Sequence, residues 1–361
     1  MDGSQLNRRI VRWLQDRFGR GEVQTAPRVG RGPTIHVIII DGTMSSLDEE
    51  CIGNAGLTYK LLQEMGSAVS VFYHPGLQWS HWRRAGDVIA GRGINRQIRI
   101  AYSWLASRYR PGDQIFLMGY SRGGYAVRSL AGIIDRVGLL RTECATERNV
   151  RDAYRHYRHL QSPKSAEAFR KANCHANVPI EMIGVWDTVK SLGLNMPWLW
   201  RLSVPKHAFH NHKLGDSVKH GYHALARDET RVAYSPILWE TNPEYPGRLV
   251  QMWFPGVHGD IGGQTGDFFQ ARPLTYIPLV WMLEQAEAVG LPLPEEWQAR
   301  FPRDPSAPSM GTFRGMARWL ITRRPRAVGL DASERVHPSV AQARNATEET
   351  SWWLPRLLGR A

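Results

Sequence analysis

The stretch "IFLMGYSRGG", residues 115–124, joins a short apolar run to a helix-like segment over residues 125–137. It contains the pentapeptide GxSxG, which in many hydrolases holds a serine on the sharp turn between a strand and a helix. Gly119 and Gly123 leave room there for closely approaching backbone. The helix that follows points backbone N–H groups and a positive dipole end at the serine. This pattern predicts that Ser121 is an exposed nucleophile, the alternative being a polar residue in a glycine turn.

Other β-branched or aromatic runs lie on both sides of this unit and alternate with helix-like stretches, as in a mainly parallel sheet. The predicted strands are residues 35–40, 68–73, 115–118, 182–186 and 249–254. Ligands bind outside the carboxyl ends of the strands in open α/β sheets, so the polar residues after these runs are expected at one edge. We predict an α/β-hydrolase-like fold, with a mainly parallel sheet flanked by helices.

The ends of two further runs supply the partners that a serine nucleophile requires. A serine hydroxyl needs a base to take its proton, and that histidine is usually oriented by a carboxylate. Ser121, Asp187 and His258 follow three of the runs in the chain order of the α/β-hydrolases. We therefore predict that they form a catalytic triad. Asp187 has a rival interpretation, because its side chain is also suited to cap a following helix.

An oxyanion hole needs one N–H group from the residue after the nucleophile, here Arg122, and one from a neighbouring loop. The loop of Asp41, Gly42 and Thr43 follows the first predicted strand, and Gly42 permits close backbone approach. Asp41 is expected to anchor this loop through hydrogen bonds. Asp260 is expected to brace the glycine-rich turn after the last run by accepting backbone N–H groups.

The charge of the chain favours anionic partners. Its 361 residues include 46 Lys and Arg against 33 Asp and Glu, a net charge of +13, which suits phospholipid surfaces or nucleic acid. Nucleic acid is disfavoured because no zinc-finger or RNP-like pattern accompanies the charge. The three cysteines lack metal-ligand spacing, so neither a metal nor another cofactor is expected. The oligomeric state stays open.

We divide the chain into a basic amphipathic segment at 1–30, a hydrolase domain at 31–300 and a basic C-terminal extension at 301–361. A Trp- and His-rich insertion at 195–222 lacks clean periodicity and is a candidate lid. A group of histidines in or next to it is expected at the surface or in this lid, a metal cluster being the alternative. These histidines are His207, His210, His212, His220 and His223.

The chain has neither a signal-peptide pattern at its N-terminus nor a run of about 18 apolar residues that would span a membrane. A cytoplasmic protein is expected, with signal-independent secretion left open. The basic ends carry tryptophans, which are favoured at lipid interfaces, so an anionic membrane surface is a candidate partner. They are Trp13, Trp319, Trp352 and Trp353. The alternative for the N-terminal segment is a helix packed on the domain with a solvated basic face.

Six segments, in order over residues 35 to about 290, together form a specific pattern. They are DGT at 41–43, FYHPG at 72–76, PGDQIFLMGYSRGGYAVRSLAG at 111–132, GVWDTVKSLG at 184–193, HALARDETR at 223–231 and WFPGVHGDIGG at 253–263. This pattern resembles the domain of unknown function family 2235. That family includes the catalytic domain of type VI secretion phospholipase effectors, an α/β-hydrolase domain.

The resemblance implies a Ser-Asp-His triad that falls on the three residues already reached from the strand ends. Tyr120, Gly124 and Gln264 depart from the Phe, Ala and Gly that the family tends to have. None of these departures removes catalytic chemistry.

The leading hypothesis is a serine ester hydrolase that acts through an acyl-enzyme on phospholipid or another lipid. One alternative is an esterase for small soluble or cell-envelope esters. A second is a non-catalytic module that uses the hydrolase scaffold to bind a membrane or another anion.

Overall fold

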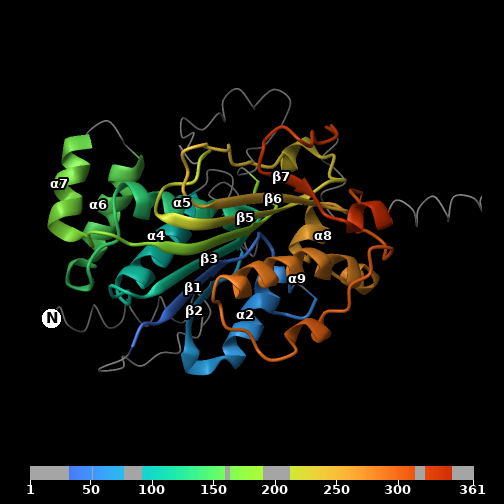
Figure 1. Cartoon of the computed structure of the whole chain (residues 1–361), viewed down its shortest axis with the longest axis horizontal. Coiled ribbons are helices and arrows are strands. Elements are labelled where there is room, and N and C mark those ends of the chain that lie inside the picture. The colour runs from blue at the N-terminus through green and yellow to red at the C-terminus, as the bar shows by residue number, and fades with distance from the viewer. Residues whose placement is uncertain are drawn as a thin grey trace, which may run out of the picture.

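The structure is a computed structural model of the chain, drawn in Figure 1. It describes residues 32–50, 52–76, 92–158, 163–189, 212–313 and 322–343. The predicted N-terminal amphipathic helix, the four interfacial tryptophans and most of the candidate lid lie outside these residues.

Within the described residues, seven strands form one sheet in the order β2-β1-β3-β4-β5-β6-β7, and every neighbouring pair is parallel. The strands are β1 (Ile35–Ile40), β2 (Val69–His74), β3 (Gln114–Tyr120), β4 (Ile180–Trp186), β5 (Val218–Ala226), β6 (Arg248–Phe254) and β7 (Glu334–Val336). The all-parallel sheet confirms the predicted α/β-hydrolase-like fold class.

Helices cover both faces of this sheet, as Figure 1 shows. The α-helices are α2 (Asn54–Glu64), α4 (Arg92–Ala106), α5 (Arg122–Arg136), α6 (Glu147–Arg158), α7 (Pro163–Asn173), α8 (His258–Gly262) and α9 (Arg272–Ala288). Short 3₁₀ helices are η1 (Gly66–Ala68), η3 (Thr142–Cys144), η4 (Val232–Tyr234), η5 (Phe269–Ala271) and η6 (Trp297–Arg300). None of the described helices is long and apolar enough to cross a bilayer.

Two apolar cores result, one on each face, and β1 contributes to both because successive side chains of a strand point to opposite faces. Ile38 and Ile40 join the core formed with α4, α5 and α6. Val37 and Ile39 join the core formed with α2 and α9. A strand buried on both faces reads as a continuous apolar run, which is why β1 and β3 were easily recognised in the sequence.

The strand order places a topological switch point between β1 and β3. From β1 the chain goes to β2 at one side, and then crosses to β3 at the other side of β1. Ligands bind at such a point in open α/β sheets, outside the carboxyl ends of the strands. Asp41 directly follows β1 and Ser121 directly follows β3, so both lie at the switch point.

The sequence missed β5 and β7. Residues 218–222, the end of the predicted insertion, belong to β5, a strand inside the sheet. His223 of this strand is fully buried, so its predicted place at the surface or in a lid was wrong. His220 is half-buried in the same strand, His212 is exposed, and His207 and His210 lie outside the described residues.

The buried imidazole of His223 is accommodated by polar neighbours. Its Nε2 accepts the N–H of Thr188 at 3.1 Å, and its Nδ1 lies 3.4 Å from Oε1 of Gln251. Burial lowers the pKa of His223 to about 3, so the ring is neutral at physiological pH. β7, which falls in the segment assigned to a C-terminal extension, pairs with β6 and belongs to the same sheet.

Candidate active site

Ser121 lies in a strained turn between β3 and α5. Its φ of 54° and ψ of −118° place a non-glycine residue in a region that L-residues seldom adopt. The turn is held because Ser121 N–H donates to the carbonyl of Trp186 at 2.9 Å. A Cβ atom at Gly123 would lie 2.0 Å from the carbonyl oxygen of Ile40, so the turn packs directly against the end of β1. This is the geometry of a nucleophile elbow.

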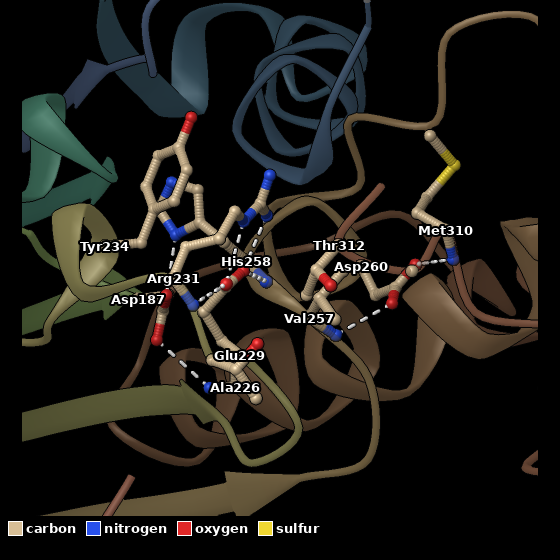
Figure 2. A network of polar contacts seen from close by, with 12 residues as sticks. Asp187, Ala226, Glu229, Arg231, Tyr234, Val257, His258, Asp260, Met310 and Thr312 are labelled. Carbon is tan, nitrogen blue, oxygen red and sulfur yellow. Dashed lines mark hydrogen bonds and ion pairs between the residues drawn. The ribbon is translucent and has the colours of Figure 1, made fainter. Parts of the chain in front are cut away.

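The structure brings the three predicted triad residues together. His258 Nε2 lies 2.9 Å from Ser121 Oγ, and His258 Nδ1 lies 2.6 Å from Asp187 Oδ2. Asp187 directly follows β4, and His258 is the first residue of α8, which follows β6. Ser121 and His258 are 6% and 5% exposed, and Asp187 is fully buried. Figure 2 shows Asp187 and His258 among their polar neighbours.

Asp187 is also held by a residue that the sequence analysis missed, Arg326. The Arg326 guanidinium donates to Oδ1 at 2.6 Å and to Oδ2 at 2.9 Å, and its side chain is 6% exposed. Oδ1 additionally accepts the N–H of Ala226 at 3.0 Å. Both carboxylate oxygens are thus occupied, with the carboxylate fixed in one orientation.

The charge state of Asp187 follows from these neighbours. Burial raises the pKa of this carboxyl group, but the charge of Arg326 and hydrogen bonds from His258 and Arg326 outweigh burial. The pKa of Asp187 therefore lies far below the ordinary aspartate range, and the group is ionised at any physiological pH. An ionised, immobile carboxylate is what the imidazole needs to hold its proton on Nδ1.

Aromatic and charged residues fix the imidazole from other sides, as Figure 2 shows in part. The Tyr234 ring stacks on His258 with centroids 4.6 Å apart, and the Arg231 guanidinium lies 4.4 Å from the Tyr234 ring centroid. Glu229 accepts the backbone N–H of His258 at 3.1 Å and pairs with Arg231 at 2.6 Å. Tyr120 hydroxyl donates to the His258 carbonyl at 3.1 Å. The histidine is therefore positioned through both its ring and its backbone.

The loop after β1 narrows the choice of oxyanion donors. Gly42 N–H donates to Asp41 Oδ1 at 2.7 Å, so it is already used. Asp41 Oδ2 accepts the Tyr73 hydroxyl at 2.9 Å, and burial raises the pKa of Asp41 to about 6. Among the described residues, the backbone N–H groups of Thr43 and Arg122 have no acceptor. The donors expected for an oxyanion therefore become Arg122 and Thr43, with Asp41 as the loop's anchor.

Asp260 has the contacts of a brace. Its Oδ2 accepts the N–H of Val257 at 2.8 Å, which closes the turn that presents His258. Its Oδ1 accepts the N–H of Met310 at 2.9 Å, so the same carboxylate ties a distant segment to this turn. Ser309 hydroxyl donates to it as well. Figure 2 shows Asp260 between Val257 and Met310.

The three residues that differ from the family pattern each have specific neighbours in the structure. The hydroxyl that Tyr120 adds reaches the backbone beside the imidazole. Gln264 side chain donates to the carbonyl of Thr43 at 2.9 Å, so it links the loops after β1 and β6. At Gly124, a Cβ would lie 2.4 Å from Thr188 Oγ1. The described part of the chain contains no group of three or more metal-ligating side chains close enough to hold an ion.

Residues 35–285 match the family model for type VI secretion system phospholipase effectors, Tle1-like, catalytic domain. The chain belongs to this family. The Tle1-like match covers β1 to β6 and contains Ser121, Asp187 and His258, but it ends before Arg326 and β7. The residue that clamps the aspartate therefore comes from outside the matched region.

Other comparisons give more distant similarities. An uncharacterized protein of Saccharomyces cerevisiae is 27% identical over 237 residues, which are 58% of this chain and 33% of that protein. An uncharacterized protein from Pseudomonas aeruginosa superposes with a TM-score of 0.43 and 17% identity, covering 98% of this chain and 57% of that chain. The Tle1 effector bound to the VgrG spike of the type 6 secretion system gives a TM-score of 0.34 and 15% identity, covering 69% and 56%. This Tle1-like chain thus spans a third to just over half of each relative's length.

Proposed function

We propose that this protein is a serine ester hydrolase that cleaves acyl esters of phospholipids through an acyl-enzyme. The observation that carries the proposal is the buried chain of contacts from Ser121 Oγ through His258 to Asp187, with distances of 2.9 and 2.6 Å. Membership of a family named for phospholipase effectors supports a lipid substrate.

In the proposed reaction, Ser121 Oγ attacks the ester carbonyl carbon while His258 Nε2 takes the hydroxyl proton. Asp187 stabilises the resulting imidazolium, and the N–H groups of Arg122 and Thr43 donate to the negative oxygen of the tetrahedral intermediate. His258 then gives its proton to the leaving alcohol oxygen as the C–O bond breaks. A water molecule then attacks the carbonyl carbon of the acyl-enzyme while His258 takes its proton. His258 returns this proton to Ser121 Oγ as the fatty acid leaves.

The test is release of free fatty acid from phospholipid vesicles, with a short p-nitrophenyl ester measured in parallel. Fatty acid release is expected from the wild-type protein, since a Ser-Asp-His triad cleaves esters without a cofactor. Turnover of the short ester without lipid cleavage would favour the soluble-ester alternative. No turnover of either substrate, in protein shown to be folded by circular dichroism, would favour the non-catalytic module.

We also propose that the basic N-terminal segment holds the enzyme on anionic lipid. The support is the net charge of +13 and the combination of Trp13 with a cluster of arginines, Arg8, Arg9, Arg12 and Arg17. Each basic residue near an anionic surface contributes about 1 kcal/mol of binding free energy.

Replacing these four arginines with glutamine is therefore expected to weaken partitioning onto phosphatidylglycerol vesicles by at least about 100-fold. Co-sedimentation with vesicles at low salt measures the effect. Phosphatidylcholine vesicles are the control, because a neutral surface gives the arginines no charge to attract. Equal partitioning of the two proteins onto the anionic vesicles would exclude this segment as the anchor.

A further inference from the structure

Arg122 is a buried cation for which the described residues provide no partner. It is the first residue of α5, directly after the nucleophile, and it is 5% exposed. Its guanidinium makes no hydrogen bond, ion pair or ring contact with any residue in the described part of the chain. Arginine carries five N–H donors and is charged at all physiological pH values, so a buried one normally has several acceptors.

Other buried arginines near the site do have such acceptors. Arg128, on the same helix and 4% exposed, donates to the backbone carbonyl of Ile237 and lies 4.3 Å from the Trp239 ring centroid. Arg326 and Arg231 each form an ion pair with a buried carboxylate. Arg122 therefore differs from these three arginines because the described residues give it no acceptor, although it is about as buried as Arg128 and Arg231.

The guanidinium nevertheless stays charged. Burial lowers the pKa of Arg122 to about 10, and the nearby Tyr234 hydroxyl opposes this shift. Burial also raises the pKa of Tyr234 above its ordinary value, so the phenol is neutral and supplies no counter-charge at neutral pH. Burying an unpaired charge is costly, and the cost is recovered when an anion enters beside it.

Arg122 lies next to the nucleophile in the chain and near an aromatic residue of the site. It follows Ser121 in the chain, and it interacts electrostatically with Tyr234, whose ring stacks on His258. The N-terminal end of the 15-residue helix α5 has no acidic residue in its first turn. The helix dipole and the guanidinium thus both favour a negative group next to the nucleophile.

We propose that the Arg122 side chain binds the phosphate group of the lipid substrate, next to the ester that Ser121 attacks. This inference rests on the proposed function and names the residue that selects the substrate class. In a glycerophospholipid the phosphate and the acyl ester are joined through the glycerol carbons, only a few bonds apart. An ester carbonyl at Ser121 Oγ therefore brings the phosphate within reach of the adjacent side chain. A neutral acylglycerol leaves the guanidinium unpaired and is disfavoured.

The test compares dioleoylphosphatidylglycerol with dioleoylglycerol, each diluted into the same Triton X-100 micelles. Arg122→Gln is expected to lower the ratio of kcat/KM for the phospholipid over the diacylglycerol by about 10- to 100-fold. Arg122→Lys keeps the positive charge and is expected to retain part of the preference. Arg136→Gln, which changes an exposed arginine of the same helix, is the matched control and is expected to keep the wild-type ratio.

The outcomes separate this inference from the proposed function. A wild-type preference that is unchanged in Arg122→Gln overturns the role of Arg122 alone. Folded wild-type protein that releases no fatty acid from either lipid overturns the proposed function and this inference with it.

A second measurement uses only wild-type protein, in case Arg122→Gln fails to fold. An ether-linked alkyl lysophosphatidic acid and the matching phosphate-free alkylglycerol compete with hydrolysis of a short p-nitrophenyl ester. The phosphate-bearing compound is expected to inhibit at least about 10-fold more strongly. Equal inhibition by the two compounds would overturn the inference. Inorganic phosphate that inhibits as strongly as the alkyl phosphate would assign the guanidinium to a free anion and overturn it too.

Discussion

Replacing Ser121 with alanine is expected to lower kcat for ester hydrolysis by roughly 10⁴- to 10⁶-fold while leaving the fold intact. The substitution removes the oxygen that would form the acyl-enzyme, and no other group in the site can replace it. Ser121 N–H still donates to Trp186, so the turn keeps its backbone hydrogen bond. Fatty acid release and p-nitrophenyl ester turnover measure the loss, and thermal unfolding checks the fold.

Ser129→Ala is the matched control for this experiment. Ser129 lies on α5, the helix that follows Ser121. It is fully buried, and its hydroxyl has no hydrogen-bond partner in the described structure. Its replacement is expected to leave both activity and stability close to wild type. Substantial hydrolysis by Ser121→Ala would sink the assignment of the nucleophile. Labelling with a fluorophosphonate gives an independent check, since only an activated Ser121 is expected to react.

Replacing Arg326 with methionine is expected to have the second largest effect. Asp187 would keep its hydrogen bonds to His258 and Ala226 N–H but lose the cation that balances its buried charge. Leaving a buried charge without its partner destabilises proteins by about 3 to 5 kcal/mol. The less constrained carboxylate is expected to cost about 100-fold in kcat, because small displacements of catalytic groups have effects of that size. Urea unfolding and ester hydrolysis measure the two effects.

The separate effects on kcat and KM distinguish a positioning role of Arg326 from a purely structural one. Arg326 contacts Asp187, so its removal is expected to lower kcat while KM stays close to wild type in the folded fraction. Arg324→Met, at an exposed arginine of the same segment, is expected to keep the wild-type kcat and KM. A wild-type kcat in folded Arg326→Met would leave Arg326 with a structural role only.

The strands that the sequence predicted are rich in β-branched and aromatic residues. β1, β2, β3, β4 and β6 were found to within two residues at every end. β1, β3 and β4 are almost fully buried and give nearly unbroken apolar runs, whereas β2 and β6 are only partly buried but keep β-branched and aromatic residues. β5, with the sequence VKHGYHALA, carries a lysine, two histidines and a glycine, so its pattern was mistaken for that of an insertion. β7 has only three residues, ERV, and two of them are exposed.

The residues of the site also divide into those that the sequence predicted and those that it missed. Ser121, Asp187 and His258 could be named because each ends a strand or follows one, and parallel strands bring their carboxyl ends to one edge. Arg326 could not be named, because it is one of several arginines in ITRRPR and reaches Asp187 across 139 residues of chain. The use of Gly42 N–H by Asp41 was equally invisible, since it depends on one side-chain rotamer.

The position of Arg326 in the sequence affects the order in which the parts of the site are synthesised. A chain emerging from the ribosome exposes the serine, the aspartate and the histidine in that order, and only much later the arginine that clamps the aspartate. The sheet from β1 to β6 can form around the first three residues while its last strand, β7, is still to be synthesised. Translation therefore delivers Arg326 and β7 together, after Ser121, Asp187 and His258. A nascent chain that has reached residue 300 carries these three residues but still lacks the guanidinium that holds Asp187.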